Sequence, residues 1–282
     1  MSSKKPLFSI ASWNINSVRL RQNQVISFLK EHQPDVLALQ ETKTPDEFFP
    51  EQVFKDAGYS YVIFNGMKSY NGVCFISKHP LTTPVIHQRV GQDDCRHLEV
   101  TCTVDQKHPI KLHNLYIPAG GDEPDRETNP KFDHKLKFVD EMTAFFPTYH
   151  DKDDAVITLG DFNIAPHEND VWSHKQLLKI ISHTPIEVEK LNAMKDAFDW
   201  PDVARFFAKD EDKLYSWWSY RARDWQKSNR GRRLDHIWVS PHLKKNSTHC
   251  ISIIKKNEIT TTATSKKTCK RTWLNGKNSS RN

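Results

Sequence analysis

Short apolar runs bounded by polar or turn residues recur along the chain. Each run is rich in Val, Ile, Leu or aromatic residues and has the length of a strand buried on both faces. The runs are FSIASW from Phe8, DVLALQE from Asp35, GVCFIS from Gly72, IKLHNLYIP from Ile110, AVITLGD from Ala155 and LDHIWVS from Leu234.

Three segments between these runs repeat apolar residues near the 3.6-residue period of a helix. They are Gln22–His32, which Pro34 ends, Lys131–Phe146 and Val171–Ser182. Strands with helices interspersed predict sheets packed against each other with helices outside. A chain of 282 residues with 37% hydrophobic content can bury such a core as one domain.

The net charge of +6 is unevenly distributed. From Lys244 onward ten Lys and Arg residues face one acidic residue, Glu258, whereas the preceding part holds 31 basic and 34 acidic residues. The body is therefore close to neutral. We expect a single catalytic domain over residues 1–254 and a basic, disordered tail over 255–282, in which no strand-like run follows Ile254.

The chain lacks an apolar run near the roughly 20 residues that a membrane helix needs, so we expect no membrane association. Its five cysteines form no CxxC pair and leave an odd count. Reduced thiols in a cytoplasmic protein, expected to be a monomer, are favoured over a disulfide framework or a zinc site.

Polar side chains stand where the apolar strands stop. Ends of buried strands converge on one rim of a sheet, where ligands bind in such folds. Carboxylate and amide oxygens there suit Mg²⁺ or Mn²⁺ rather than zinc. Taken singly, each residue could instead cap a helix or form a turn. The residues are Asn14, Asn16, Glu41, Tyr116, Asp161, Asn163 and Asp235.

Together these segments resemble the exonuclease III family of abasic-site endonucleases, within the endonuclease–exonuclease–phosphatase superfamily. The GDFN turn alone is moderately specific, while the tyrosine turn with the tryptophan-rich block indicates the DNA-repair branch. The resemblance runs from about Phe8 to about Cys250. It lies in SWNINSVRLR, PDVLALQETK, LYIPAGGD, LGDFNIAPHENDVWSHKQLL and YSWWSYRARDWQKSNRGRRLDHIWVSP.

The resemblance implies a four-layer α/β sandwich, in which two packed mixed sheets are flanked by helices. It also implies Mg²⁺-dependent cleavage of double-stranded DNA at abasic sites or 3′ ends. Asn14 and Glu41 would lie at the metal, together with Asp161 and Asn163. Asp161 would activate the attacking water, Asn163 would stabilise the transition state and Tyr116 would contact the scissile phosphate. Asp161 can act as a base only if its surroundings raise its pKa.

The same resemblance assigns DNA contacts to the tryptophan block. Trp217, Trp218, Tyr220 and Arg221 resemble the wall around a flipped-out abasic sugar, an apolar pocket that excludes a nucleotide with a base. Neighbours on a strand face opposite ways, so we expect one tryptophan in the core and the other in the site. Candidate phosphate contacts, each also open to a solvated-surface interpretation, are Arg19, Arg21, Arg96, Arg230 and Arg232.

The resemblance ends before the Ser-Asp-His segment with which this family normally closes. Its Asp joins the metal site, and its His is oriented by the residue that matches Asp235. The chain has no Ser-Asp-His after residue 250. His236 adjoins Asp235 and should face the opposite side of its strand. We therefore expect an exposed sheet edge, impaired catalysis, a frameshifted or degenerate tail, and little structural effect of removing Thr260–Asn282.

Two alternatives remain open at this point. One is a catalytically dead DNA-binding module whose basic tail supplies affinity. The other is a superfamily phosphatase that acts on inositol phosphates or lipids, against which the tryptophan block argues.

Overall fold

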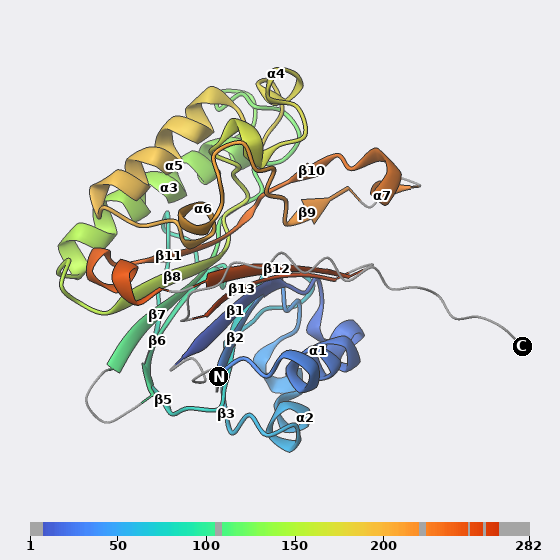
Figure 1. Cartoon of the computed structure of the whole chain (residues 1–282), viewed down its shortest axis with the longest axis vertical. Coiled ribbons are helices and arrows are strands. Elements are labelled where there is room, and N and C mark those ends of the chain that lie inside the picture. The colour runs from blue at the N-terminus through green and yellow to red at the C-terminus, as the bar shows by residue number, and fades with distance from the viewer. Residues whose placement is uncertain (1–7, 105–108, 220–223, 248, 256–257, 265–282) are drawn as a thin grey trace, which may run out of the picture.

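The computed structural model describes residues 8–104, 109–219, 224–247, 249–255 and 258–264. Two mixed sheets stack face to face, with helices covering each outer side (Figure 1). The expected four-layer α/β sandwich is therefore confirmed.

The first sheet has six strands, of which β1 and β2 are parallel neighbours. Its order is β12 (His249–Lys255), β13 (Glu258–Thr264), β1 (Ser9–Asn14), β2 (Val36–Gln40), β4 (Val73–Ser77) and β3 (Tyr61–Asn65).

The second sheet has five strands, of which β7 and β8 are the parallel pair. Its order is β11 (Asp235–Val239), β8 (Val156–Asp161), β7 (Pro109–Tyr116), β6 (His97–Thr103) and β5 (Leu81–Ile86). A separate hairpin pairs β9 (Trp217–Trp218) with β10 (Gly231–Arg232).

Three buried clusters separate the four layers. Ile10, Val36 and Phe75 of the first sheet meet Leu112 and Leu159 of the second between the sheets. The outward-facing residues of the first sheet pack on α1 (Val18–His32), beside which lies α2 (Glu51–Asp56). Those of the second sheet pack on α3 (Pro130–Tyr149) and α5 (Pro185–Ala197).

Short helices complete the fold within the described residues. They are α4 (His174–Leu177), α6 (Val203–Phe207), α7 (Trp225–Ser228) and the 3₁₀ turns Asp46–Phe48, Glu168–Asp170 and Pro241–Asn246. None of the helices in the described ranges is long and apolar enough to cross a bilayer.

The helices predicted over Gln22–His32 and Lys131–Phe146 are confirmed as parts of α1 and α3. The helix predicted over Val171–Ser182 is wrong, because only His174–Leu177 is α-helical there. Val171 instead forms a β-bridge with Arg232, and the Trp172 N–H donates to the Gly231 carbonyl. This pairing holds the start of the segment extended.

The expectation that no strand follows Ile254 is also wrong. β13 pairs antiparallel with β12 along its length and with β1 from Ser9↔Thr264 to Ser12↔Thr261. The edge of β1 that we expected to be exposed is therefore covered, and the sheet extends at least to Thr264. The division into a domain over 1–254 and a disordered tail misses this strand.

A chain that ends at Lys255 should have a lower melting temperature than the full chain, because it leaves the hydrogen-bonding groups of β1 unpaired. A loss of about 2 kcal/mol corresponds to a drop of roughly 4–8 °C at this size. The matched control ends at Thr264 and keeps every described strand. Equal melting curves for the chains that end at Lys255 and Thr264 would show that β13 does not stabilise the sheet.

Candidate active site

The predicted polar residues meet at one end of the space between the sheets. On the second sheet, Tyr116, Asp161 and Asp235 lie opposite one another on the adjacent strands β7, β8 and β11. Asn14 ends β1 of the first sheet, and Glu41 directly follows β2. Each sheet therefore supplies part of a single site.

Direct hydrogen bonds join these residues across the two sheets. The Asn14 amide donates to Glu41 Oε1 and to Asp161 Oδ2, at 2.8 Å in each case. The Tyr116 hydroxyl donates to Glu41 Oε1 at 2.9 Å. Four of the residues that the sequence pointed to thus form one connected cluster.

A buried amide pair lies directly beneath this cluster. Gln40 Nε2 donates to Asn114 Oδ1 at 2.7 Å. Asn114 Nδ2 in turn donates to the carbonyls of Leu39 and Cys74, at 3.0 and 2.9 Å. Asn114 belongs to the second sheet and its three partners to the first. These bonds fix the offset between the sheets one residue before Glu41 and two before Tyr116.

The backbone at the site has conformations that constrain the sequence. Gly160, immediately before Asp161, has φ +140°, and a Cβ there would lie 1.9 Å from the Leu115 carbonyl oxygen. Glu41 and Asn163 both have φ 54°, in the left-handed region that non-glycine residues seldom adopt. The GDFN turn is therefore a strained and specific structure.

Glu41 is ionised and well partnered. Burial alone would raise its pKa, but hydrogen bonds from Asn14, Lys43 and Tyr116 and the Lys43 charge outweigh burial and lower that pKa. Lys43 Nζ lies 2.7 Å from Glu41 Oε2. Sequence reasoning did not single out Lys43, although it lies within the quoted PDVLALQETK segment.

The pKa values of Asp161 and Asp235 are raised, whereas that of Glu41 is lowered. Burial raises the pKa of Asp161 to about 7, against the Asn14 hydrogen bond and with a further contribution from the Glu41 charge. Burial, followed by the charges of Asp161 and Glu41, raises the pKa of Asp235 well above its usual value. The condition under which Asp161 can act as a base at neutral pH is therefore met.

The donor set fits a divalent cation bound by oxygen. Three carboxyl groups gather here, and Asp235 Oδ1 is buried without a hydrogen-bond partner among the described residues. A carboxylate site that is short of positive charge and offers hard oxygen ligands suits Mg²⁺ or Mn²⁺. Glu41, Asn14 and Asp161 are the residues that would hold the ion, and the Lys43 ammonium would compete with it for Glu41.

Asn163 is held in place partly by Lys135, a residue that the sequence did not indicate. Its N–H donates to Asp161 Oδ1 at 2.9 Å, and its amide donates to the Ile117 carbonyl at 2.9 Å. The fully buried Lys135 ammonium donates to the Asn163 carbonyl at 2.9 Å and forms an ion pair with Glu187. Lys135 looked like one more polar residue of a helix, and only its burial shows that it supports the site.

His236 faces away from the site, as its position next to Asp235 predicted. Its Nε2 donates to the Ile164 carbonyl at 2.9 Å, and its ring stacks on Phe162. Ser216 Oγ accepts the N–H groups of Leu234 and Asp235. His236 therefore cannot replace the absent C-terminal histidine.

The tryptophan hairpin begins directly after Ser216, with Trp217 and Trp218. Trp218 is 7% exposed, and its Nε1 donates to Asn229 Oδ1 at 3.1 Å. Trp217 is half-buried beneath the Arg232 guanidinium, 5.4 Å from its ring centre. Trp218 is thus the more buried of the pair, while Trp217 is the one that packs against the buried apolar cluster containing Val171 and Leu234.

The predicted arginines lie in different environments. The Arg96 guanidinium lies 4.7 Å from the Tyr116 ring centre and donates to the Tyr116 carbonyl at 3.2 Å. Arg230 is exposed above the Trp172 ring, and Arg19 is exposed on α1. Of the predicted arginines that the structure describes, only Arg96 contacts the cluster directly. Tyr220 and Arg221 lie outside the described residues.

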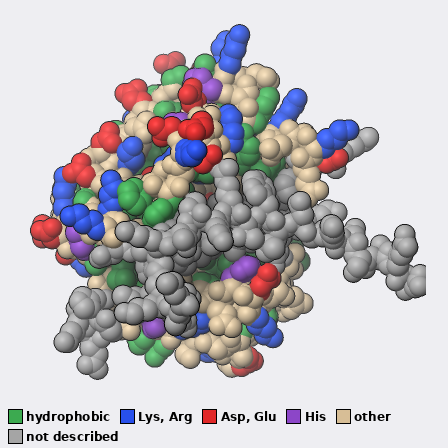
Figure 2. Space-filling model, in the orientation of Figure 1, with side chains coloured by type: hydrophobic (Ala, Val, Ile, Leu, Met, Phe, Trp, Pro, Cys, Tyr) green, Lys and Arg blue, Asp and Glu red, His purple; other side chains and the backbone are tan. Residues whose placement is uncertain are grey.

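The described surface carries both signs of charge. On the face in Figure 2, Lys and Arg side chains are interspersed with Asp and Glu over the helices, with no single extended basic area among the coloured residues. This distribution matches the nearly neutral body calculated from the sequence.

Comparisons with known proteins agree with this geometry. The profile of the Endonuclease/Exonuclease/phosphatase family matches residues 11–254. Exodeoxyribonuclease III of Haemophilus influenzae is 29% identical over 252 residues, covering 86% of this chain and 90% of that protein.

Two solved structures share the fold. An AP endonuclease from Archaeoglobus fulgidus has a TM-score of 0.83 and 26% identity, covering 91% of this chain and 98% of that one. A 3′ phosphatase from Neisseria, bound to a product DNA hairpin, has a TM-score of 0.80 and 25% identity, with 91% and 98% covered.

The raised pKa of Asp161 predicts a pH-dependent stability in chelator-treated protein. The folded state holds a proton that the unfolded chain releases near pH 4, so this contribution is present below pH 4 and is lost as pH rises to about 7. Asp161→Asn should remove that loss and stabilise the protein by roughly 1–3 kcal/mol at pH 7.

Urea unfolding of both proteins at pH 4, 5.5 and 7 measures this difference. The gap should widen with pH, while Asp196→Asn, at an exposed aspartate on α5, should show none. A gap that stays constant with pH would mean that Asp161 titrates normally.

Proposed function

Because the chain belongs to the Endonuclease/Exonuclease/phosphatase family, we propose that it is a Mg²⁺-dependent DNA repair nuclease that hydrolyses phosphodiesters at abasic sites and 3′ ends. The carrying observation is the Asn14–Glu41–Tyr116–Asp161 cluster, in which one carboxyl group has a pKa of about 7. The names of the relatives, an exodeoxyribonuclease III and an AP endonuclease, support a DNA substrate. We propose that it acts as a cytoplasmic monomer, with a catalytic domain that includes β13.

In this proposal Asp161 accepts the proton of the attacking water. Its two oxygens are already oriented, Oδ2 by the Asn14 amide and Oδ1 by the Asn163 N–H. A base whose pKa lies close to the working pH combines a useful unprotonated fraction with a real affinity for the proton. Burial brings the pKa of Asp161 close to neutral pH. The reaction then needs no covalent nucleophile, because Asp161 activates water.

Glu41, Asn14 and Asp161 would hold the cation, with Asn163 close by. When bound, Mg²⁺ would polarise the phosphoryl oxygen and offset the charge that develops on the phosphate. One N–H of the Asn163 amide donates to Ile117, which fixes its plane. We assign its other N–H to the transition state, as a donor held in advance.

Tyr116 stays protonated and acts as a donor. Burial and the charges of Glu41 and Asp161 raise the pKa of its hydroxyl above its usual value. Its hydrogen bond to Glu41 aims the phenol into the site, where we assign it to the scissile phosphate. Arg96, which lies against the ring and forms an ion pair with Asp94, is the arginine that we assign to the neighbouring phosphate.

We assign recognition of the abasic sugar to the β9–β10 hairpin. Trp217 and Trp218 follow Ser216, which contacts the backbone of Asp235, so the hairpin starts at the site and projects from it (Figure 1). Tyr220, Arg221 and Arg230 continue the same segment, and Arg19 contributes from α1. Few and localised phosphate contacts suit an enzyme that must release its DNA.

The state of Asp235 favours an impaired enzyme as the second candidate function. In the described residues its Oδ1 has no hydrogen-bond partner, and its pKa is raised well above normal. A carboxyl group paired with an imidazolium would instead be ionised. We therefore propose that turnover is low for this family, and that a DNA-binding protein without activity is the limiting case.

The decisive experiment uses a duplex that carries a tetrahydrofuran abasic-site analogue, with Mg²⁺ or with EDTA. We expect the protein to incise the abasic duplex in Mg²⁺ and not in EDTA. We expect no incision of a duplex without the abasic-site analogue. Binding with a steep salt dependence but no incision at high enzyme concentration would support the inactive DNA-binding protein. Hydrolysis of an inositol phosphate without action on DNA would contradict both.

Asp161→Asn should lower the incision rate about 10²- to 10⁴-fold, which is what a general base contributes. Binding to the abasic duplex should change little, because no phosphate contact is assigned to Asp161. Single-turnover rates and binding isotherms measure the two effects, with Asp196→Asn as the control. An unchanged rate would remove Asp161 from the mechanism.

Trp218→Ala should reduce abasic-site incision more than binding to an intact duplex, because it removes part of the pocket wall that we assign to the baseless sugar. Trp218 is buried, so the melting temperature is measured in parallel, and Trp218→Phe serves as the conservative control. Equal losses of incision and of intact-duplex binding would make Trp218 an ordinary core residue.

A further inference from the structure

Four histidines and a glutamate gather on the outer face of the second sheet, beneath α3 and away from the proposed active site. Leu98 and Val100 of β6 face the inter-sheet core, so the alternate residues of that strand face α3. All but one of the five side chains are buried, and none has a role in the proposed reaction. They are His87, His97, Glu99, His113 and His150.

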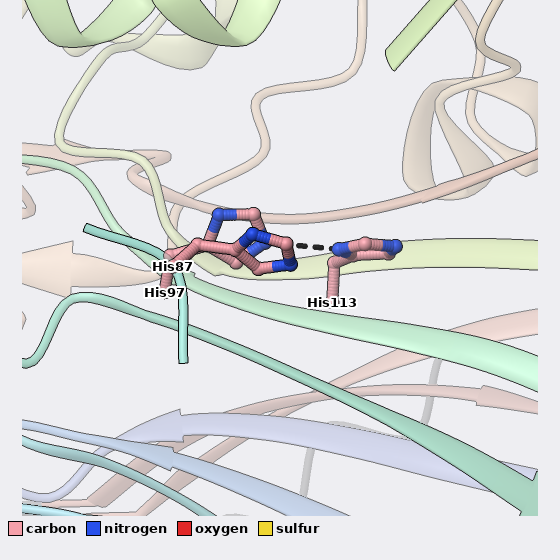
Figure 3. A group of neighbouring side chains, drawn as sticks. All are labelled: His87, His97 and His113. Atoms are coloured by element: carbon pink, nitrogen blue, oxygen red, sulfur yellow. Dashed lines mark hydrogen bonds between the residues drawn. The ribbon is translucent and has the colours of Figure 1, made fainter. Parts of the chain in front are cut away.

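Three of these imidazoles converge, one from the residue directly after β5 (His87), one from β6 (His97) and one from β7 (His113). His97 Nε2 lies 2.9 Å from His113 Nδ1, and the His87 and His97 rings stack with 4.3 Å between their centroids (Figure 3). The ligand atoms of His87, His97 and His113 all lie within 4.8 Å of one another. We propose that these three histidines bind one divalent transition-metal ion, of which zinc is the expected species.

In two of the proposed ligands, His87 and His113, the Nε2 atom, which would not bind the metal, already has a hydrogen-bond partner. His87 Nε2 lies 2.8 Å from Glu99 Oε2, which leaves Nδ1 of His87 for the metal. His113 Nε2 lies 2.8 Å from His150 Nε2, so His113 can donate there while Nδ1 binds the ion. Metal-binding histidines commonly donate their second N–H to a carboxylate or another acceptor, which fixes the tautomer.

His97 is the ligand that must change its partner. Arg89 donates to His97 Nδ1 from Nε at 3.1 Å and from a terminal nitrogen at 3.0 Å. A neutral imidazole that accepts at Nδ1 carries its proton on Nε2 and cannot bind a metal there. Arg89 therefore competes with the ion, and binding requires its guanidinium to leave His97.

Arg89 has alternatives once it leaves His97. Its guanidinium already lies 4.0 Å from the Phe145 ring centre. The Glu141 carboxylate, which accepts the N–H of Val90, contributes a favourable charge nearby. A displaced Arg89 guanidinium would therefore still lie beside the Phe145 ring and near the negative charge of Glu141.

The ligand chemistry separates this site from the proposed catalytic centre. Neutral imidazoles select zinc and its neighbours, whereas the carboxylate and amide oxygens of the catalytic cluster select Mg²⁺ or Mn²⁺. Burial lowers the pKa of both His97 and His113 well below the usual value, so both are unprotonated at neutral pH. An ion here would join the residue that follows β5 to the first residue of β6 and to the interior of β7.

The site adjoins the catalytic cluster through one residue. His97 follows Arg96, whose side chain lies against Tyr116. An ion held by His87 and His97 would fix both ends of the 88–96 segment, which carries Arg96. The role that we infer is therefore structural, and it holds whether or not the chain cleaves DNA.

The test titrates ZnCl₂ into the chelator-treated full chain by calorimetry, with Mg²⁺ in excess. All variants are also made in the Asp161→Asn background, so that zinc at the carboxylate cluster is not counted. The wild type should bind one more equivalent than His87→Gln, and its melting temperature should rise with zinc where that of His87→Gln does not. His87 is only partly buried, so this variant should fold.

Two further variants test the assigned geometry. Arg89→Met should raise zinc affinity on the order of tenfold, because it removes the competitor at His97, and His150→Asn should lower affinity about 10- to 100-fold without removing the site. His242→Gln, at an exposed histidine, is the control.

Equal zinc binding by wild type and His87→Gln would overturn the proposal and leave a chain of hydrogen-bonded neutral imidazoles. Loss of the equivalent in His150→Asn with retention in His87→Gln would also overturn it, and would favour the neighbouring Glu99, His113 and His150 triad instead.

Discussion

The hydrogen bonds of Asn114 determine how the two sheets lie on each other. Apolar contacts between two sheets are non-directional and tolerate small displacements. The Asn114 amide tolerates little, because it is buried and must reach the carbonyls of Leu39 and Cys74 and the Gln40 amide at once. Glu41 and Tyr116, which come from different sheets, can then meet at 2.9 Å.

That meeting creates an electrostatic imbalance. Burying Glu41, Asp161 and Asp235 together costs free energy, and only Glu41 has enough donors to stay ionised comfortably. Burial, with a contribution from the Glu41 charge, raises the pKa of Asp161 to about 7, and the uncompensated negative charge gives the site its affinity for a cation. The fold is thus locally less stable where it is chemically useful.

Much of this site could be predicted from the sequence. Asn14, Glu41, Tyr116 and Asp161 end strongly apolar runs, and such strand ends converge on one rim. Two supporting residues could not be found this way. Lys135 lies in a helix rich in charged residues, and Asn114 lies between His113 and Leu115 inside a strand, so neither position carries a local signal.

The errors have the same physical origin. Val171 begins a helical pattern, but its pairing with Arg232, distant in sequence, overrides the local preference. The polarity of the segment EITTTAT predicts a disordered tail, although threonine and isoleucine favour strands. The four histidines, which follow β5, lie in β6 and β7, and cap α3, have no motif spacing, and only the fold brings them together.

The pairing of Ser9 with Thr264 has a consequence for biosynthesis. A chain emerges from the ribosome N-terminus first, so β1 can pair with β2 long before Glu258–Thr264 has been made. Until then one side of β1 presents open backbone donors and acceptors to any other strand it meets. The first sheet therefore closes only after Thr264 has been made, through a contact between segments that lie far apart in the sequence, which makes this a slow step in forming the sheet.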